Sequence, residues 1–448
     1  MSGLSADKAA ALVHMVRSLP DGRLRTLRDA LASQAPGGWA DPVLRAAEAE
    51  TADRRLRDSV LYEFAALCGP REVASRFPVA RFVAAAVWET LKITAPGRIA
   101  ASAQAVAARE PALFDPASLA LVEIAAAGLL AGEGAFGPLA AKLEASPGGA
   151  DRVTRYLRLV PIARAALPRA TSWLKRAGQE DVSALSLALS DASALCQDGG
   201  PLLIELLSSA FADRWTALRL SSALMDKPSE VFMAGSEFAG FAEAVLDQVD
   251  EAVTMVRDFD GTRGREGGAA VAAATERAID GLSELEHWVQ LDREKPWGRR
   301  TAAQRRALSL AAEARLKEAE NALALALPIQ SFRPGMKAVR GRPRLGAPAD
   351  LMAVARAEAL LTYVDETRRA AMKGGFGTLR GKVVEALDTR LSTYVDDLLD
   401  MLHTPDPDVT PEMTDEMRER LELAADLLGL VRDAGATQIV RRRMAAAA

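Results

Sequence analysis

The chain has 448 residues, of which 49% are hydrophobic and 26% charged, and its formal net charge is −4. This apolar content is enough for a large buried core, which excludes an intrinsically disordered chain. The acidic balance excludes a uniformly basic nucleic-acid coat protein. The two cysteines, Cys68 and Cys196, are too few for a disulfide framework or a cysteine-based zinc site. We interpret both as buried small hydrophobic residues and expect a cytoplasmic protein.

The composition predicts an all-α fold. Aromatic residues make up only 5% of the chain, and Ala and Leu, which favour helices, supply much of its apolar content. Helix starts are predicted where an N-cap residue precedes a proline, at Asp41-Pro42, Asp115-Pro116 and Thr410-Pro411. The apolar stretch from Pro116 to Gly132 is interrupted by Glu123, so we predict a buried helix there and not a membrane span.

Taken in chain order, residues 1–198 contain short, closely spaced helical segments without a fixed period. They predict an irregular, solenoid-like array of antiparallel helix pairs. Residues 199–328 predict a central bundle of longer helices, with a flexible loop at 260–268. A basic linker is expected at 329–349, followed by a C-terminal helical hairpin bundle at 350–434 and a frayed tail.

The predicted helix 382–403 carries a sharp apolar stripe. Its spacing alternates between three and four residues, which is typical of a heptad seam. Such a stripe usually packs inside its own chain, but it is also a candidate face for a partner helix. The residues of this candidate face are Leu387, Leu391, Tyr394 and Leu398.

Three possible chemical motifs do not support catalysis. Asp396-Asp397-Leu398-Leu399-Asp400 resembles the aspartate-rich motif of all-α prenyl-transfer enzymes, but too little chain follows it, and we expect a solvated acidic face. The glycine-rich stretch 373–382 lacks phosphate-loop spacing and predicts a hinge between helices. His14, His287 and His403 have no second ligand at metal-binding spacing. We therefore assign no catalytic, cofactor or metal residue.

The clearest local signal is a basic segment. No acidic residue occurs between Glu320 and Asp350. Arg340-Gly341-Arg342-Pro343 resembles the core of an AT-hook, which places an extended chain in the minor groove of A·T-rich DNA. A solvated basic linker is the alternative. The candidate contacts for nucleic acid or an acidic partner in this segment are Arg333, Lys337, Arg340, Arg342 and Arg344.

A second basic stretch covers residues 152–176, where Arg152, Arg155 and Arg158 are further candidate contacts for phosphate or an acidic surface. An acidic stretch follows at 226–260. Opposite charges within one chain suggest either internal pairing or a charged partner protein.

These features together predict a non-enzymatic helical adaptor or scaffold that binds partner proteins through helical faces and charge patches. The alternative is a nucleic-acid-associated regulatory factor that uses residues 152–176 and 333–344. A third hypothesis is an all-α enzyme whose site has no sequence motif. The sequence names no partner, and it is compatible with self-association.

Overall fold

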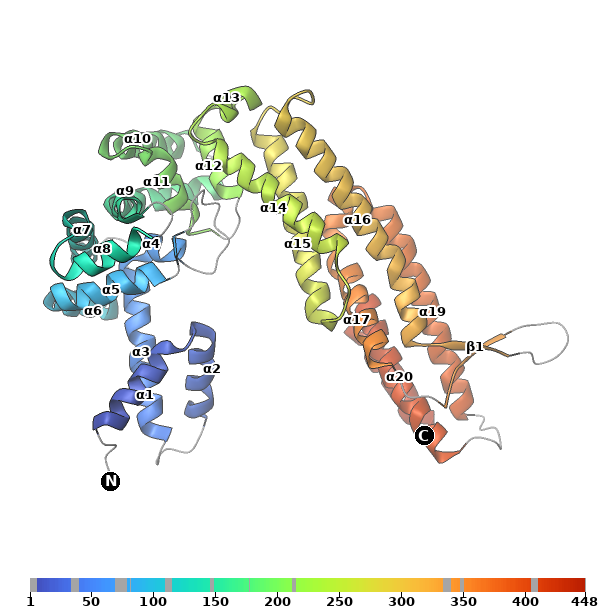
Figure 1. Cartoon of the computed structure of the whole chain (residues 1–448). Coiled ribbons are helices and arrows are strands. Elements are labelled where there is room, and N and C mark those ends of the chain that lie inside the picture. Colours follow the sequence, from blue (N-terminus) through green and yellow to red (C-terminus); the bar gives the residue numbers. More distant parts are fainter. Residues whose placement is uncertain are drawn as a thin grey trace. The chain divides into compact units, whose positions relative to one another are not determined.

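A computed structural model describes residues 6–33, 40–68, 79–80, 82–108, 115–145, 149–176, 178–211, 215–332, 340–346, 350–403 and 410–447. These residues form an all-α protein, which confirms the predicted fold class (Figure 1). The described residues contain twenty-one α-helices, one short 3-10 helix and one two-stranded sheet. The chain divides into two compact units, Met1–Asp226 (unit 1) and Lys227–Ala448 (unit 2).

Unit 1 consists mainly of short helices around the longer helix α9, which packs against α7, α10 and α11. Its elements are α1 (Ala6–Ser18), α2 (Asp21–Ala32), α3 (Ala40–Val60), α4 (Tyr62–Leu67), α5 (Phe82–Thr94), α6 (Pro96–Ala108), α7 (Pro116–Ala131), η1 (Gly134–Phe136), α8 (Gly137–Leu143), α9 (Gly149–Lys175), α10 (Gln179–Leu195), α11 (Gly199–Ser208) and α12 (Trp215–Leu224).

The predicted helix starts are confirmed at two of three positions. The Asp115 carboxylate accepts hydrogen bonds from the backbone N–H groups of Ala117 and Ser118, both at 3.1 Å. Thr410 caps its helix in the same way through its hydroxyl. Helix α3, however, begins at Ala40, so Asp41 lies in its first turn and is not the N-cap. An acid there still interacts favourably with the helix dipole.

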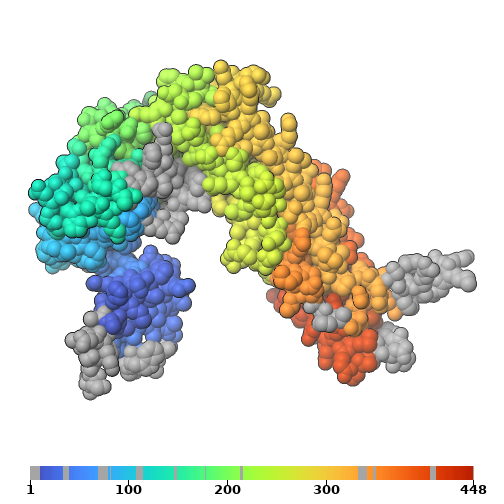
Figure 2. All heavy atoms as spheres, in the orientation of Figure 1, coloured from blue at the N-terminus to red at the C-terminus, as the bar shows by residue number. Residues whose placement is uncertain are grey.

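Unit 2 contains longer helices that pack side by side and a short hairpin (Figure 1). The side chains of these helices fill the space between their ribbons (Figure 2). Its elements are α13 (Glu230–Ala234), α14 (Ala239–Arg257), α15 (Gly264–Trp288), α16 (Pro296–Ala326), β1 (Ile329–Phe332), β2 (Arg340–Pro343), α17 (Leu351–Glu366), α18 (Arg368–Gly374), α19 (Gly377–His403), α20 (Pro411–Val431) and α21 (Ala434–Ala447).

The structure divides the chain differently from the predicted boundaries at 198/199 and 329–349. Helix α11 packs on α4, α9 and α10, so the segment after residue 198 belongs to unit 1. One continuous apolar core joins α14–α17 to α19–α21, so the predicted central and C-terminal bundles form a single unit. Contacts between helices that are far apart in the sequence decide these boundaries, and no local sequence signal indicates such contacts.

Parts of three segments expected to be irregular have regular secondary structure within the described residues. Helix α15 starts at Gly264, inside the predicted flexible loop 260–268. The expected linker contains β1 and β2, which pair antiparallel with Ile329 opposite Pro343 and Gln330 opposite Arg342. The expected frayed tail, residues 441–448, belongs as far as Ala447 to α21, and its Arg441 pairs with Glu422 at 2.8 Å.

Among the described residues, no single helix has the length and apolar character to span a membrane. Helix α7 meets that criterion only together with the segment Gly134–Leu143, to which it is joined by a bend of 74°. Leu121, Val122 and Ala125 of α7 are fully buried, in agreement with the buried helix predicted there.

Gly268 permits the close contact of α15 with α17. A Cβ atom at this position would lie 2.1 Å from the carbonyl oxygen of Ala359. We expect Gly268→Ala to lower the free energy of unfolding by about 1–3 kcal/mol, because the two helix backbones must separate. The matched control is Gly381→Ala in α19, where a Cβ atom meets nothing within 4 Å. The control should stabilise the protein by about 0.5–1 kcal/mol. Urea unfolding measures the change in the free energy of unfolding for each variant. Equal changes in Gly268→Ala and Gly381→Ala would contradict the role assigned to Gly268.

Candidate functional site

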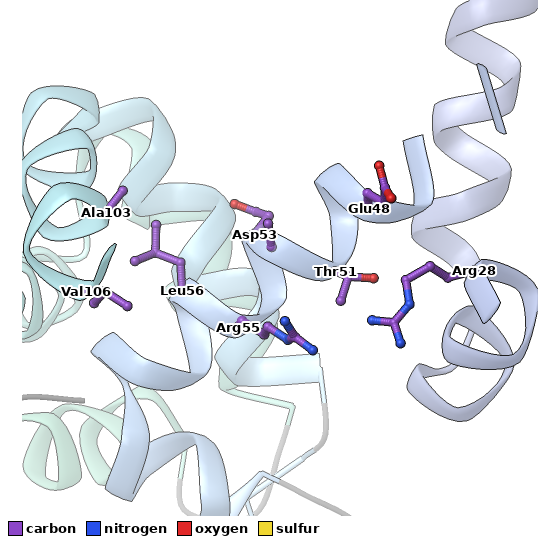
Figure 3. A pocket seen from close by; sticks show the side chains of 9 residues that line it. Arg28, Glu48, Thr51, Asp53, Arg55, Leu56, Ala103 and Val106 are labelled. Carbon is purple, nitrogen blue, oxygen red and sulfur yellow. The ribbon is translucent and has the colours of Figure 1, made fainter. Parts of the chain in front are cut away.

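The candidate site is a cleft in unit 1 between α2, α3 and α6. It holds about 800 Å³, opens widely to solvent, and has a size common for ligand sites. Five of its residues lie on one face of α3, since positions 48, 51, 52, 55 and 56 follow helical spacing. The lining residues are Arg28, Glu48, Thr51, Ala52, Asp53, Arg55, Leu56, Ala103 and Val106 (Figure 3).

A small core fixes α2 against α3 and so positions Arg28. Val16, Leu24 and Ala47 from α1, α2 and α3 are almost completely buried together. Arg54 reinforces the corner between α1 and α2. Its guanidinium donates to the carbonyl oxygens of Arg17 and Leu19, both at 3.0 Å, which are acceptors near the C-terminal end of α1.

Two carboxylates complete the environment of Arg54. It pairs with Asp21 at the start of α2 and with Glu50 at 2.7 Å on its own helix. Burial lowers the pKa of Arg54, but the hydrogen bonds to Glu50 and Asp21 outweigh this effect, and its pKa is raised. The guanidinium therefore stays charged and holds the α1–α2 corner on α3.

Two guanidinium groups converge across the cleft. Arg28 from α2 and Arg55 from α3 point toward one another with Thr51 between them (Figure 3). Arg28 is half-buried and donates to the Asp29 carboxylate at 2.6 and 2.9 Å. Arg55 is exposed, and no hydrogen bond or ion pair joins it to the rest of the described chain. Asp29 neutralises part of the Arg28 charge, so Arg55 supplies most of the positive charge that favours an anion in the cleft.

The carboxylates of the cleft face away from this pair. Asp53 accepts hydrogen bonds from Trp88 Nε1 and Lys92 Nζ on α5, both at 3.0 Å. The Glu48 carboxyl group also points away from the two guanidinium groups in Figure 3. Burial lowers the pKa of Lys92, but hydrogen bonds to Glu89 and Asp53 more than compensate, so its pKa is raised. Lys92 therefore neutralises Asp53 on the α5 side.

The third wall of the cleft is apolar. Leu56, Ala103 and Val106 are all half-buried, so each leaves apolar surface open to a ligand. The cleft therefore combines a cationic end with an apolar wall. It offers no cysteine or histidine among its lining residues, and the Thr51 hydroxyl donates to the Ala47 carbonyl at 2.7 Å. This arrangement can bind a ligand, but it lacks a paired nucleophile and base.

Comparison of the chain with protein-family models, with curated proteins and with solved structures finds no match. The cleft is therefore interpreted from its own geometry.

The arginines predicted as a basic face on α9 are largely neutralised within unit 1. Arg152 faces the buried Glu205 at 3.4 Å, and Arg155 pairs with Asp151 and, at 3.7 Å, with Asp198. Arg158 is exposed and donates to a backbone carbonyl oxygen at 3.4 Å. Internal charge pairing was one of the two predicted alternatives, but these carboxylates do not come from the acidic stretch 226–260.

That acidic stretch has partners in unit 2. Asp247 and Asp250 pair with Arg300 of α16 at 2.6 and 2.5 Å. Glu230 is buried and caps the start of α16, where its carboxylate accepts from the backbone N–H groups of Trp297 at 2.7 Å and Gly298 at 3.1 Å.

The predicted contacts in the basic segment are described only in part. Arg333 and Lys337 lie outside the described residues. Arg340 begins β2, and Arg342 and Arg344 are exposed. The four residues that resemble an AT-hook thus form a strand paired with β1 and are not a free extended chain, which corrects the expected linker.

The candidate partner-helix face is part of the core. Leu387, Leu391, Tyr394 and Leu398 are at most 1% exposed and pack inside unit 2. The structure therefore corrects the hypothesis that this stripe of α19 meets a partner. It supports the alternative of an internal seam.

The other tested motifs have structural roles. Asp396 and Asp400 are exposed, as expected of a solvated acidic face, and Asp396 pairs with Arg443 at 2.8 Å. The glycine-rich stretch forms the predicted hinge between α18 and α19, with Gly375 at φ 83°. His14, His287 and His403 are all exposed. Within the described parts of the chain, no group of three or more His, Cys, Asp or Glu residues is placed to hold a metal ion.

The two cysteines differ in environment. Cys68 is buried, and this burial raises the pKa of its thiol to about 12, so the thiol stays protonated near neutral pH. Cys196 is only partly buried, so the prediction that both are core residues holds for Cys68 alone.

A buried ion pair ties α4 to α9. Arg164 and Glu63 are at most 2% exposed and form a two-point contact at 2.9 and 3.1 Å. Arg164 also donates to the Val60 carbonyl at 2.9 Å, and the Ser209 hydroxyl, just after α11, donates to the Glu63 carbonyl at 2.9 Å. These contacts satisfy the pair within the protein, so we assign it to the architecture and not to a ligand.

Removing one partner of this buried pair should be costly. We expect Arg164→Met to lower the free energy of unfolding by about 3–5 kcal/mol, because the Glu63 carboxylate is left without its counter-charge. The double variant Glu63→Met/Arg164→Met should recover most of that loss. Arg418→Met is the control and should change the free energy of unfolding by less than about 1 kcal/mol, because Arg418 and its partner Asp415 are 45% and 74% exposed. Denaturant unfolding measures the free energy of unfolding of each variant. If the double variant lost as much stability as the sum of the two single variants, the assignment would be contradicted.

Proposed function

We propose that this chain is a non-enzymatic helical adaptor and that unit 1 binds a partner protein in the cleft between α2, α3 and α6. The observation that carries the proposal is the convergence of Arg28 and Arg55 in an open cleft beside an apolar wall. Arginine is enriched at protein interfaces, and the buried centre of an interface is more apolar than the rest of the protein surface.

The nucleic-acid alternative has weaker support. The arginines at 152 and 155 already face carboxylates, which reduces the positive field available to phosphates. The minor groove of undistorted B-DNA is about 6 Å wide, which suits a single extended chain better than the two-stranded ribbon of β1 and β2. The exposed Arg342 and Arg344 remain its best candidates.

Affinity capture tests the proposal: the full chain is immobilised and incubated with an extract of the cells that produce it. We expect Arg28→Glu/Arg55→Glu to reduce recovery of the partner by at least about tenfold, because two favourable charges become repulsive. The matched control, Arg23→Glu/Arg277→Glu, makes the same charge change at exposed positions outside the cleft and outside the two basic segments, and it should recover the partner normally.

Circular dichroism of both variants verifies that each remains folded. Equal recovery by the cleft variant and the wild type would contradict the proposal. Recovery of nuclease-sensitive material in place of a protein would favour the alternative.

A further inference from the structure

The cleft also indicates what kind of ligand it would take. A guanidinium group presents several N–H donors in one plane and matches the two oxygens of a carboxylate. Arg28 uses Nε and one Nη for Asp29, which leaves its other Nη free of that contact. Arg55 brings a second guanidinium to the same space. One carboxylate between the two groups would accept from both and remove their mutual repulsion.

The apolar wall adds a second requirement. Leu56 lies one residue beyond Arg55 on the lining face of α3, and Ala103 and Val106 face the cleft from α6. A ligand that carries only charge would leave this surface in water. A small or medium apolar side chain next to the acid would cover this apolar wall and remove it from water.

The remaining charges argue against a polyanion. Glu48 lines the cleft, and Asp29, whose side chain is 59% exposed, is bonded to Arg28 at the cleft. A nucleic-acid strand carries closely spaced phosphates, so some of them would meet these carboxylates. A single acidic side chain can reach the two arginines without that cost.

We infer that the cleft binds a protein segment in which an Asp or Glu carboxylate sits beside a small or medium apolar side chain. The carboxylate lies between the guanidinium groups of Arg28 and Arg55, and the apolar side chain packs on Leu56, Ala103 and Val106. This inference rests on the proposed function, because it specifies the part of the partner that the cleft receives.

Selection from a random seven-residue peptide library displayed on phage, with the intact chain as bait, tests the inference. The wild-type chain and the control Arg23→Gln/Arg277→Gln should both enrich peptides with an acid next to an apolar residue. Arg28→Gln/Arg55→Gln should lose that enrichment. A fluorescent copy of the most enriched peptide should bind the wild type at least about tenfold more tightly than the cleft variant.

Changes in the peptide separate the two requirements. Replacing its acid by the corresponding amide should weaken binding at least about tenfold, and replacing its apolar residue by Ser should weaken it severalfold. Failure to enrich acidic peptides, or equal binding of the amide version, would overturn the inference. So would displacement of the peptide by a single-stranded oligonucleotide or by inorganic phosphate at equal concentration.

The carboxylate inference and the proposed function can fail independently of each other. Enriched peptides that lack an acid but still need Arg28 and Arg55 would overturn the carboxylate inference alone. A captured partner that does not depend on these arginines would overturn the proposed function.

Discussion

Pairing between arginine and carboxylate decides which surface of unit 1 remains open to a ligand. Arg164 forms an ion pair with Glu63 in the core. Arg152 and Arg155 pair with carboxylates on α11 and α9. Arg54 is used to hold the α1–α2 corner on α3. Arg55, the next residue along the same helix, points into the cleft, where Arg28 faces it. The adjacent arginines on α3 therefore have opposite roles, one structural and one available for binding.

Local signals in the sequence predicted the fold class and several helix ends. Asp115 and Thr410 cap their helices because a short polar side chain before a proline satisfies free N–H groups at once. The three-and-four spacing of Leu387, Leu391 and Leu398 predicted a helix with one apolar face. The same spacing could not decide whether that face meets its own chain or a partner, because both environments exclude water from the same side chains.

Features that depend on contacts between distant residues were missed. Gly268 was interpreted as part of a flexible loop, but it lies in α15, where the absence of a Cβ atom lets the backbone of α17 pass close by. Gly341 was interpreted as part of an AT-hook, but a Cβ atom there would lie 2.6 Å from the side chain of Ile329 on the paired strand. In both cases the residue that gives the glycine its role is distant from it in the sequence.

The cleft was missed for the same reason. Glu48, Thr51 and Arg55 follow helical spacing, which indicates one face of α3 and nothing about what lies opposite it. Arg28 reaches the cleft only because the core formed by Val16, Leu24 and Ala47 fixes α2 against α3. The predicted basic segments drew attention because their charges are consecutive in sequence. A binding pair assembled from two helices has no such signature.

The central claim is that a partner protein occupies the cleft of unit 1. Hydrogen–deuterium exchange of the full chain, measured with and without its captured partner, tests it most directly. We predict slower exchange on binding in α2, in residues 48–56 of α3 and in α6, with little change in α19 and α20. Protection confined to the hairpin of β1 and β2 or to unit 2, with the cleft helices unchanged, would contradict the claim.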